Sequence, residues 1–162
     1  MPHIPQRWDG PDYWYFVTVV THRRRPVFAD ESACRLLQSS FHEAHHHYPF
    51  RLAALVILPD HWHALIRPGI RETTMTEAAV SRPTHKQVVI EQVVGAVKRN
   101  VLRDLRIRDL TIWQTRFLDH RIRDEDDFLH HLEYIRLNPV KHGYAAEPDW
   151  YGWCFIHKRP FG

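Results

Sequence analysis

The chain has 162 residues, of which 44% are hydrophobic and 25% charged, and its formal net charge is +3. These values are typical of a folded globular protein and predict one domain over residues 1–162. No apolar run approaches the roughly 20 residues that a membrane helix needs, and residues 1–7 show no secretory signal. The two cysteines, Cys34 and Cys154, are far apart and fit a reducing compartment. We therefore expect a cytoplasmic protein without membrane association.

Strand and helix signals alternate along the first half of the chain. Aromatic and β-branched residues or continuous apolar runs predict strands over residues 13–21, 50–58 and 61–67. Asp30 or Ser32 can cap a helix that runs to about Tyr48. The turn signal Pro59-Asp60 separates the second strand from the third.

The second half continues this pattern. Residues 68–83 have turn and polar character without a period, and we interpret them as a loop. A valine-rich apolar face predicts a helix that begins at Thr84. A fourth strand is expected over residues 117–122. Asp124 can cap a last helix, which we expect to end near residue 137, before Asn138-Pro139.

The predicted order is strand, helix, two strands, helix, strand and helix. This order is close to the split β-α-β-β-α-β unit of ferredoxin-like and RRM-like domains, with a C-terminal helix added. The fold class is therefore α+β, with an antiparallel sheet that carries helices on one face. The other face would be free for a site.

The segment His61-Trp62-His63 begins the third predicted strand. Residues two apart on a strand point to the same face, so the two imidazoles would lie side by side. Imidazole is a common ligand of divalent transition metals. Two ligands are too few for a tight site, and the sequence therefore predicts a third ligand elsewhere in the chain.

The last predicted helix can supply that ligand. Its core stripe would be Phe128, Leu132 and Ile135, and roughly the opposite side would carry Asp127, His130, His131, Tyr134 and Asn138. Residues four apart are neighbours on a helix face, so the Asn138 carbonyl oxygen and the Tyr134 phenol would lie together. A nearby divalent cation stabilises developing negative charge and polarises a phosphodiester. The combination predicts attack by tyrosine on a nucleic-acid phosphodiester, leaving a covalent phosphotyrosine.

Basic residues gather in four clusters, which suit contacts with a phosphate backbone. For any one cluster the alternative is an ordinary solvated surface. The predicted DNA-binding residues are Arg23, Arg24 and Arg25; Lys98, Arg99 and Arg103; Arg116, Arg121 and Arg123; and Lys141 with His142.

Several of these segments resemble a known family. Residues 58–63, LPDHWH, resemble the histidine motif of HUH nucleases, although Asp60 stands where that family usually has asparagine. Residues 113–117, 121–124 and 134–143 resemble the signature of REP-associated tyrosine transposases, which are single-tyrosine HUH transposases of bacteria. The resemblance spans roughly Tyr13 to Trp150.

The resemblance implies an HUH nuclease fold and a role for each residue of the site. His61 and His63 would be metal ligands, Asn138 would occupy the third-ligand position, and Tyr134 would be the nucleophile. The cofactor would be Mg²⁺ or Mn²⁺, and the substrate a single-stranded, REP-like DNA hairpin. Cleavage would leave a 5′-phosphotyrosine and a free 3′-OH. The protein would be a monomer or a homodimer.

Two other functions stay open from the residues alone. A non-catalytic module could bind single-stranded nucleic acid through aromatic residues of the first strand, such as Tyr13, Trp14 and Tyr15. A metal-dependent hydrolase could use the same histidines with an activated water. Tyr144 is a second candidate nucleophile, but it follows Gly143 in a predicted loop with no metal ligand at helical spacing.

Overall fold

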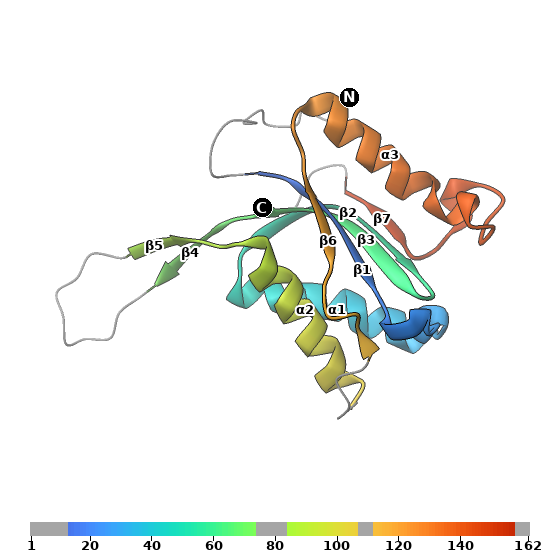
Figure 1. The fold of residues 1–162 in the computed structure, drawn as a ribbon, viewed down its shortest axis with the longest axis horizontal. Helices are drawn as coiled ribbons and strands as arrows, with labels where there is room; N and C mark the ends of the chain where they lie inside the picture. The colour runs from blue at the N-terminus through green and yellow to red at the C-terminus, as the bar shows by residue number, and fades with distance from the viewer. Residues whose placement is uncertain (1–12, 74–83, 107–111, 158–162) are drawn as a thin grey trace.

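The computed structural model describes residues 13–73, 84–106 and 112–157, and its centre is a five-stranded antiparallel sheet (Figure 1). The strand order is β6-β1-β3-β2-β7. The first four strands in this order have the arrangement of a ferredoxin-like unit, and β7 is added beside β2. The strands are β1 (Tyr15–Val20), β2 (Phe50–Leu58), β3 (His61–Pro68), β6 (Leu118–Arg121) and β7 (Cys154–Ile156).

Helices cover both faces of this sheet. Figure 1 shows α1 (Glu31–His47) and α2 (Ile90–Asp104) on one face and α3 (Glu125–Lys141) on the other. The predicted α+β class and antiparallel sheet are confirmed. The face that we expected to be free for a site is covered in part by α3. Within the described ranges, the connections also contain the short 3₁₀ helices η1 (His22–Arg24), η2 (Val27–Ala29) and η4 (Pro148–Trp150).

The α1/α2 face holds the larger hydrophobic core. Side chains alternate along β3, so Trp62, Ala64 and Ile66 all point into this core and are fully buried. The valines of α2 pack on the same cluster, which overrides their modest helix propensity. Asp30 caps α1 as predicted, because its carboxylate accepts a hydrogen bond of 3.0 Å from the Ser32 backbone N–H.

The segment before α2 differs from the prediction. Strands β4 (Ile70–Thr73) and β5 (Thr84–Gln87) pair as an antiparallel ribbon that extends from one end of the sheet (Figure 1). The loop that we predicted over residues 68–83 is therefore wrong at residues 70–73, which form a strand, and the predicted helix start at Thr84 is wrong because α2 begins at Ile90. Cross-strand pairing decides the conformation at β5, and sequence periodicity does not show such pairing. Residues 74–83 of the expected loop lie outside the described residues.

The helix α3 also differs, because it continues through Pro139 to Lys141. A proline inside a helix lacks the N–H that would bond to the carbonyl four residues earlier. Here that carbonyl belongs to Ile135, and the Cys154 thiol of β7 donates to it at 3.8 Å. The predicted end near residue 137 is therefore wrong, and the extra turn places Asn138 within the helix.

A second, smaller hydrophobic cluster lies between α3 and the sheet. Phe128 and Ile135 of α3 pack there with Trp14 and Leu65, and the Trp14 and Phe128 rings meet edge to face at 5.2 Å between centroids. The expected polar side of the helix is wrong at two positions. Asp127 and Asn138 are buried within α3, whereas we predicted them opposite the core stripe.

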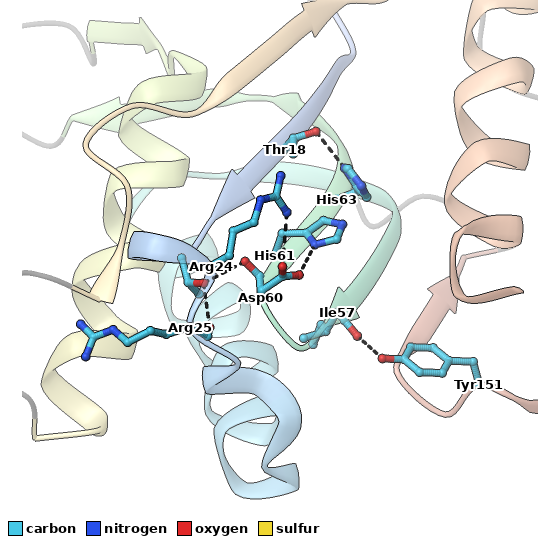
Figure 2. A network of polar contacts seen from close by, with 9 residues as sticks. Thr18, Arg24, Arg25, Ile57, Asp60, His61, His63 and Tyr151 are labelled. Atoms are coloured by element: carbon cyan, nitrogen blue, oxygen red, sulfur yellow. Dashed lines mark hydrogen bonds and ion pairs between the residues drawn. The ribbon is translucent and has the colours of Figure 1, made fainter. Parts of the chain in front are cut away.

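The C-terminal part of the described chain returns to the sheet. Cys154 to Ile156 form β7 against β2, and the Tyr151 hydroxyl donates to the Ile57 carbonyl at 2.6 Å (Figure 2). Within residues 13–73, 84–106 and 112–157, no helix has the length and apolar character needed to cross a membrane.

Candidate metal and tyrosine site

His61 and His63 lie side by side at the start of β3, as predicted. Their ring centroids are 4.9 Å apart, and both residues are buried, with 7% and 5% of their surface exposed. Figure 2 shows both rings on the same side of the strand. This is the sheet face that α3 covers, so the two imidazoles lie between the sheet and the helix.

A partner at Nδ1 fixes the orientation of each ring. His61 Nδ1 lies 2.6 Å from the Asp60 carboxylate, and His63 Nδ1 lies 2.8 Å from the Thr18 hydroxyl (Figure 2). A carboxylate only accepts, so His61 donates from Nδ1 and its free lone pair is on Nε2. The same tautomer of His63, with Nδ1–H donating to Thr18, also leaves Nε2 free. This arrangement is typical of histidines that bind a metal.

Burial keeps both imidazoles neutral, which is the form that binds a metal. Burial, with a smaller contribution from the neighbouring His61, lowers the pKa of His63 to about 3. Burial also lowers the pKa of His61, although the bond to Asp60 acts in the opposite direction. Both residues can therefore act as ligands at neutral pH without first losing a proton.

Asp60 is anchored from two sides. Arg24 Nη1 lies 3.3 Å from its second carboxylate oxygen, and the Thr21 backbone N–H and hydroxyl donate to its backbone carbonyl at 2.9 and 3.0 Å. Burial alone would raise the pKa of Asp60, but the bonds from His61 and Arg24 outweigh this effect and the pKa is lowered. The residue that departs from the family's asparagine is thus an ionised carboxylate that orients a candidate ligand.

Tyr134 of α3 faces the histidines. Its ring centroid lies 5.4 Å from that of His63. Phe16 of β1 stacks on His63 at 5.2 Å and meets the Tyr134 ring edge to face at 5.7 Å. The Lys141 ammonium lies 5.3 Å from the centre of the Tyr134 ring. The structure therefore brings the predicted nucleophile to the predicted ligands, with a cation beside it.

Asn138 lies between two contacts that join α3 to β3. It is four residues after Tyr134, which contacts His63, and four before His142, whose ring lies 5.6 Å from that of His61. Asn138 is completely buried, and neither its amide oxygen nor its amide nitrogen has a partner among the described residues.

An unpaired buried polar group destabilises a fold by about 1–3 kcal/mol, so this amide requires an explanation. A metal ion held by His61, His63 and the Asn138 oxygen would supply a partner for that oxygen. Two imidazole nitrogens and an amide oxygen form a donor set that divalent cations accept. The residues present therefore fit a metal.

The structure separates the predicted DNA-binding residues into different surroundings. Three of them lie at the site. Arg24 contacts Asp60, Lys141 lies over the Tyr134 ring, and the His142 ring lies beside that of His61. The Arg121 guanidinium stacks over the Tyr13 ring at 4.4 Å, and Arg123 lies at the start of α3. Arg23, Arg25, Arg99 and Arg116 are exposed.

Two basic residues of α2 already have intramolecular partners. The Lys98 ammonium donates to the Gln114 carbonyl at 3.0 Å, and Arg103 donates to both carboxylate oxygens of Glu43 of α1, from Nη1 at 2.7 Å and from Nη2 at 2.5 Å. Both lie on the helical layer across the sheet from Tyr134. Contact between the α2 cluster and DNA stays a prediction.

Sequence reasoning missed two residues that shape the site. Thr18 stands opposite His63 in the β1–β3 register, and Phe16 packs between His63 and Tyr134. Neither has a motif of its own. Only the pairing of the first and third strands, which the ferredoxin-like order predicts, would have identified them.

Comparisons with known proteins agree with this site. Residues 11–118 match the family described as "Transposase IS200 like". The chain is 33% identical over 137 residues to a protein of Haemophilus influenzae named as a REP-associated tyrosine transposase, covering 84% of this chain and 76% of the relative. It is 28% identical over 138 residues to the REP-associated tyrosine transposase of Escherichia coli K12, covering 85% and 72%.

A solved structure shows the same fold. It is a REP-associated tyrosine transposase bound to a REP hairpin, with a TM-score of 0.68, 23% identity, and coverage of 95% of this chain and 82% of that one. The fold and the matched sequence define a transposase of the IS200-like class. The chain belongs to this family and, within it, to the REP-associated tyrosine transposases.

Proposed function

We propose that the protein cleaves and rejoins single-stranded DNA through a covalent bond to Tyr134. The observation that carries this proposal is the position of the Tyr134 ring, 5.4 Å from the buried and neutral His63. The phenol oxygen would attack the phosphorus of a phosphodiester and form a 5′-phosphotyrosine. The bond to the 3′ oxygen would break and leave a free 3′-OH, and attack by a 3′-OH on the phosphotyrosine would restore the diester.

His61, His63 and Asn138 would hold Mg²⁺ or Mn²⁺. When bound, the ion would neutralise charge on the phosphate and favour its attack by a weak nucleophile. Thr18 and Asp60 keep the Nε2 atoms of both histidines directed into the site. Lys141 places a positive charge 5.3 Å from the centre of the Tyr134 ring, where it would stabilise negative charge that develops on the phosphate, and the phenolic proton would leave to solvent.

The substrate that we propose is a single-stranded DNA hairpin of the REP type. The support is the solved relative, a REP-associated tyrosine transposase bound to a REP hairpin. Exposed cations around the site, including Arg24 and Lys141, would contact the backbone phosphates. We place the reaction in the bacterial cytoplasm, because both named relatives are bacterial transposases.

A denaturing gel tests the proposal. Labelled single-stranded hairpin DNA from the flanks of the gene would be incubated with the protein in Mn²⁺ or in EDTA. Wild type should give a metal-dependent protein–DNA band that survives denaturation. Tyr134→Phe should give no such band, and Tyr144→Phe, the matched control, should behave as wild type.

The other two functions give different results in the same assay. Cleavage without a covalent band, retained in Tyr134→Phe, would identify a hydrolase that uses an activated water. Hairpin binding without cleavage in Mn²⁺ or Mg²⁺ would identify a binding module. Either result would overturn the proposal.

A further inference from the structure

A second group of metal-type side chains lies on the α3 face, beside the proposed site. It consists of His120 from β6 and of Asp127 and His131 from α3. One ligand atom from each residue lies within 4.8 Å of the other two. These three residues come from two elements and belong to none of the roles described above.

Two imidazole nitrogens converge on one buried carboxylate. His120 Nε2 lies 2.9 Å from Asp127 Oδ2. His131 Nδ1 lies 2.8 Å from the Asp127 backbone carbonyl and 3.3 Å from Asp127 Oδ1, so a metal would take the place of the proton that this nitrogen shares with the carbonyl. The two rings are stacked, with centroids 4.8 Å apart and an angle of 22° between their planes. The Asp127 side chain is only 5% exposed, whereas that of His120 is 42% exposed. The cluster is therefore anchored on its inner side and open to solvent on its outer side.

The carboxylate has its own supporting contacts. The Arg123 backbone N–H donates to Asp127 Oδ2 at 3.0 Å, and the Arg123 side chain approaches the same oxygen at 3.4 Å. Burial would raise the pKa of Asp127, but these bonds and the one from His120 outweigh that effect and lower it. Asp127 is thus ionised and held in place by hydrogen bonds. Carboxylates that bind a metal are usually held in the same way by neighbouring groups.

From this geometry we infer a second metal site, formed by His120, Asp127 and His131 and suited to Zn²⁺ or a similar transition metal. Two imidazoles and one carboxylate are a recurrent ligand set of zinc sites and of non-haem iron sites. The donor set has a single carboxylate, so it favours Zn²⁺, Co²⁺ or Ni²⁺ over Mg²⁺. The exposed side of His120 leaves room for a water as a further ligand.

This site is distinct from that of His61 and His63. Phe16 lies between the two, 4.7 Å from the His131 ring and 5.2 Å from the His63 ring. A metal here would join edge strand β6 to the first half of α3, the helix that carries Tyr134. Metal binding to the folded state alone would therefore stabilise the position of that helix on the sheet.

A titration with Co²⁺ tests the inference, because cobalt bound to nitrogen ligands absorbs visible light. The protein would be stripped of metal with EDTA and titrated by absorbance and by calorimetry. The His61→Ala/His63→Ala variant removes the proposed Mg²⁺ or Mn²⁺ site. It should still bind one equivalent of Co²⁺, and Zn²⁺ should displace that ion and raise the melting temperature.

Adding His120→Ala to this background should weaken Co²⁺ binding at least tenfold and abolish the Zn²⁺-dependent thermal shift. His120 is half-exposed on an edge strand, so its removal should leave the circular dichroism spectrum unchanged. His46→Ala, an exposed histidine on α1, is the matched control and should change neither reading.

Three results would overturn the site: no Co²⁺ binding by the double variant, binding unaffected by His120→Ala, or an equal loss in His46→Ala. In each case the three side chains would be a hydrogen-bonded cluster only. None of these readings depends on DNA cleavage, so this test can fail while the proposed tyrosine chemistry holds.

Discussion

The two faces of β3 have opposite chemistry although they come from the same eight-residue strand. Trp62, Ala64 and Ile66 enter an apolar core beneath α1 and α2. His61 and His63 point to the other face, where their polar nitrogens are buried beneath α3. Burial of hydrocarbon stabilises the fold by roughly 25 cal/mol per Å². Burial of unpaired or protonatable groups destabilises it.

The comparison assigns stability mainly to one face and chemistry to the other. On the α3 face, Thr18 and Asp60 provide partners for the two histidines, but the Asn138 amide has none. Functional sites commonly retain such unfavourable arrangements because activity requires them. Substitutions on the α1/α2 face should therefore mainly lower stability. Substitutions at the site on the α3 face should mainly weaken metal binding.

The largest effect on stability should come from Trp62→Ala on the core face. The side chain is fully buried and packs edge to face on Phe41 at 5.1 Å. Its removal should lower the free energy of unfolding by about 3–5 kcal/mol, measured by urea denaturation. A loss under about 1 kcal/mol would show that this face does not carry the stability assigned to it.

On the opposite face, stability should depend on pH through His63. Burial lowers its pKa to about 3 from 6.5 in the unfolded chain, so between these values the unfolded state binds a proton that the native state does not. Stability from this source is complete above pH 6.5 and is lost as the pH falls toward 3. In EDTA, wild type should lose about 3 kcal/mol more than His63→Gln between pH 6.5 and 4. Equal pH profiles in urea denaturation would contradict the buried neutral imidazole.

Thr18→Val should separate metal affinity from packing. It preserves the shape of the side chain but removes the hydroxyl that bonds to His63 Nδ1 at 2.8 Å. Loss of such a partner typically weakens metal binding by about 10–100-fold, which a Mn²⁺ titration would detect. Thr18→Ser keeps the hydroxyl and should bind almost as wild type. If both variants bind equally well, the hydroxyl has no role in orienting His63.

Asn138→Leu should abolish metal binding and raise the stability of the metal-free protein. It replaces an unpaired buried amide with an apolar group of similar branching. Without metal, the free energy of unfolding should rise by about 1 kcal/mol, while Mn²⁺ binding and formation of the covalent complex should be lost. A destabilised variant that still binds Mn²⁺ would show that Asn138 is a packing residue and not a ligand.

The smallest effects should come from the basic residues of α2. Arg103→Ala removes the contacts with Glu43 and should lower the urea midpoint only slightly, because both side chains are exposed to solvent. Arg99→Ala removes an exposed cation and should reduce the salt dependence of DNA binding by about one unit of slope if α2 contacts phosphates. An unchanged slope would exclude α2 from the DNA-binding surface.

Local patterns were enough to predict much of this molecule. Alternation along residues 61–67 correctly placed His61 and His63 on one face and Trp62 on the other. Asp124 was correctly predicted to cap α3, and Asp30, one of the two candidate caps with Ser32, begins α1. The order of elements predicted the order of the central strands, because few arrangements connect them without crossing.

Features that depend on distant partners were not predicted. The ribbon of β4 and β5 depends on pairing across residues 74–83, which have no clear period. The last turn of α3 depends on the Cys154 thiol, which bonds to the carbonyl that Pro139 leaves free. Burial of Asn138 follows from that extra turn. The role of Asn138 as a third ligand stays a prediction, and its position opposite the core stripe was wrong.

Direct mapping of the covalent DNA attachment tests the central claim. The complex formed with hairpin DNA in Mn²⁺ would be digested with nuclease and trypsin and analysed by tandem mass spectrometry. Cleavage after Arg136 and Lys141 places Tyr134 and Tyr144 in separate peptides. We predict a 5′-linked nucleotide on the Tyr134 phenol oxygen. A nucleotide on Tyr144, or cleaved DNA without any modified peptide, would contradict the account.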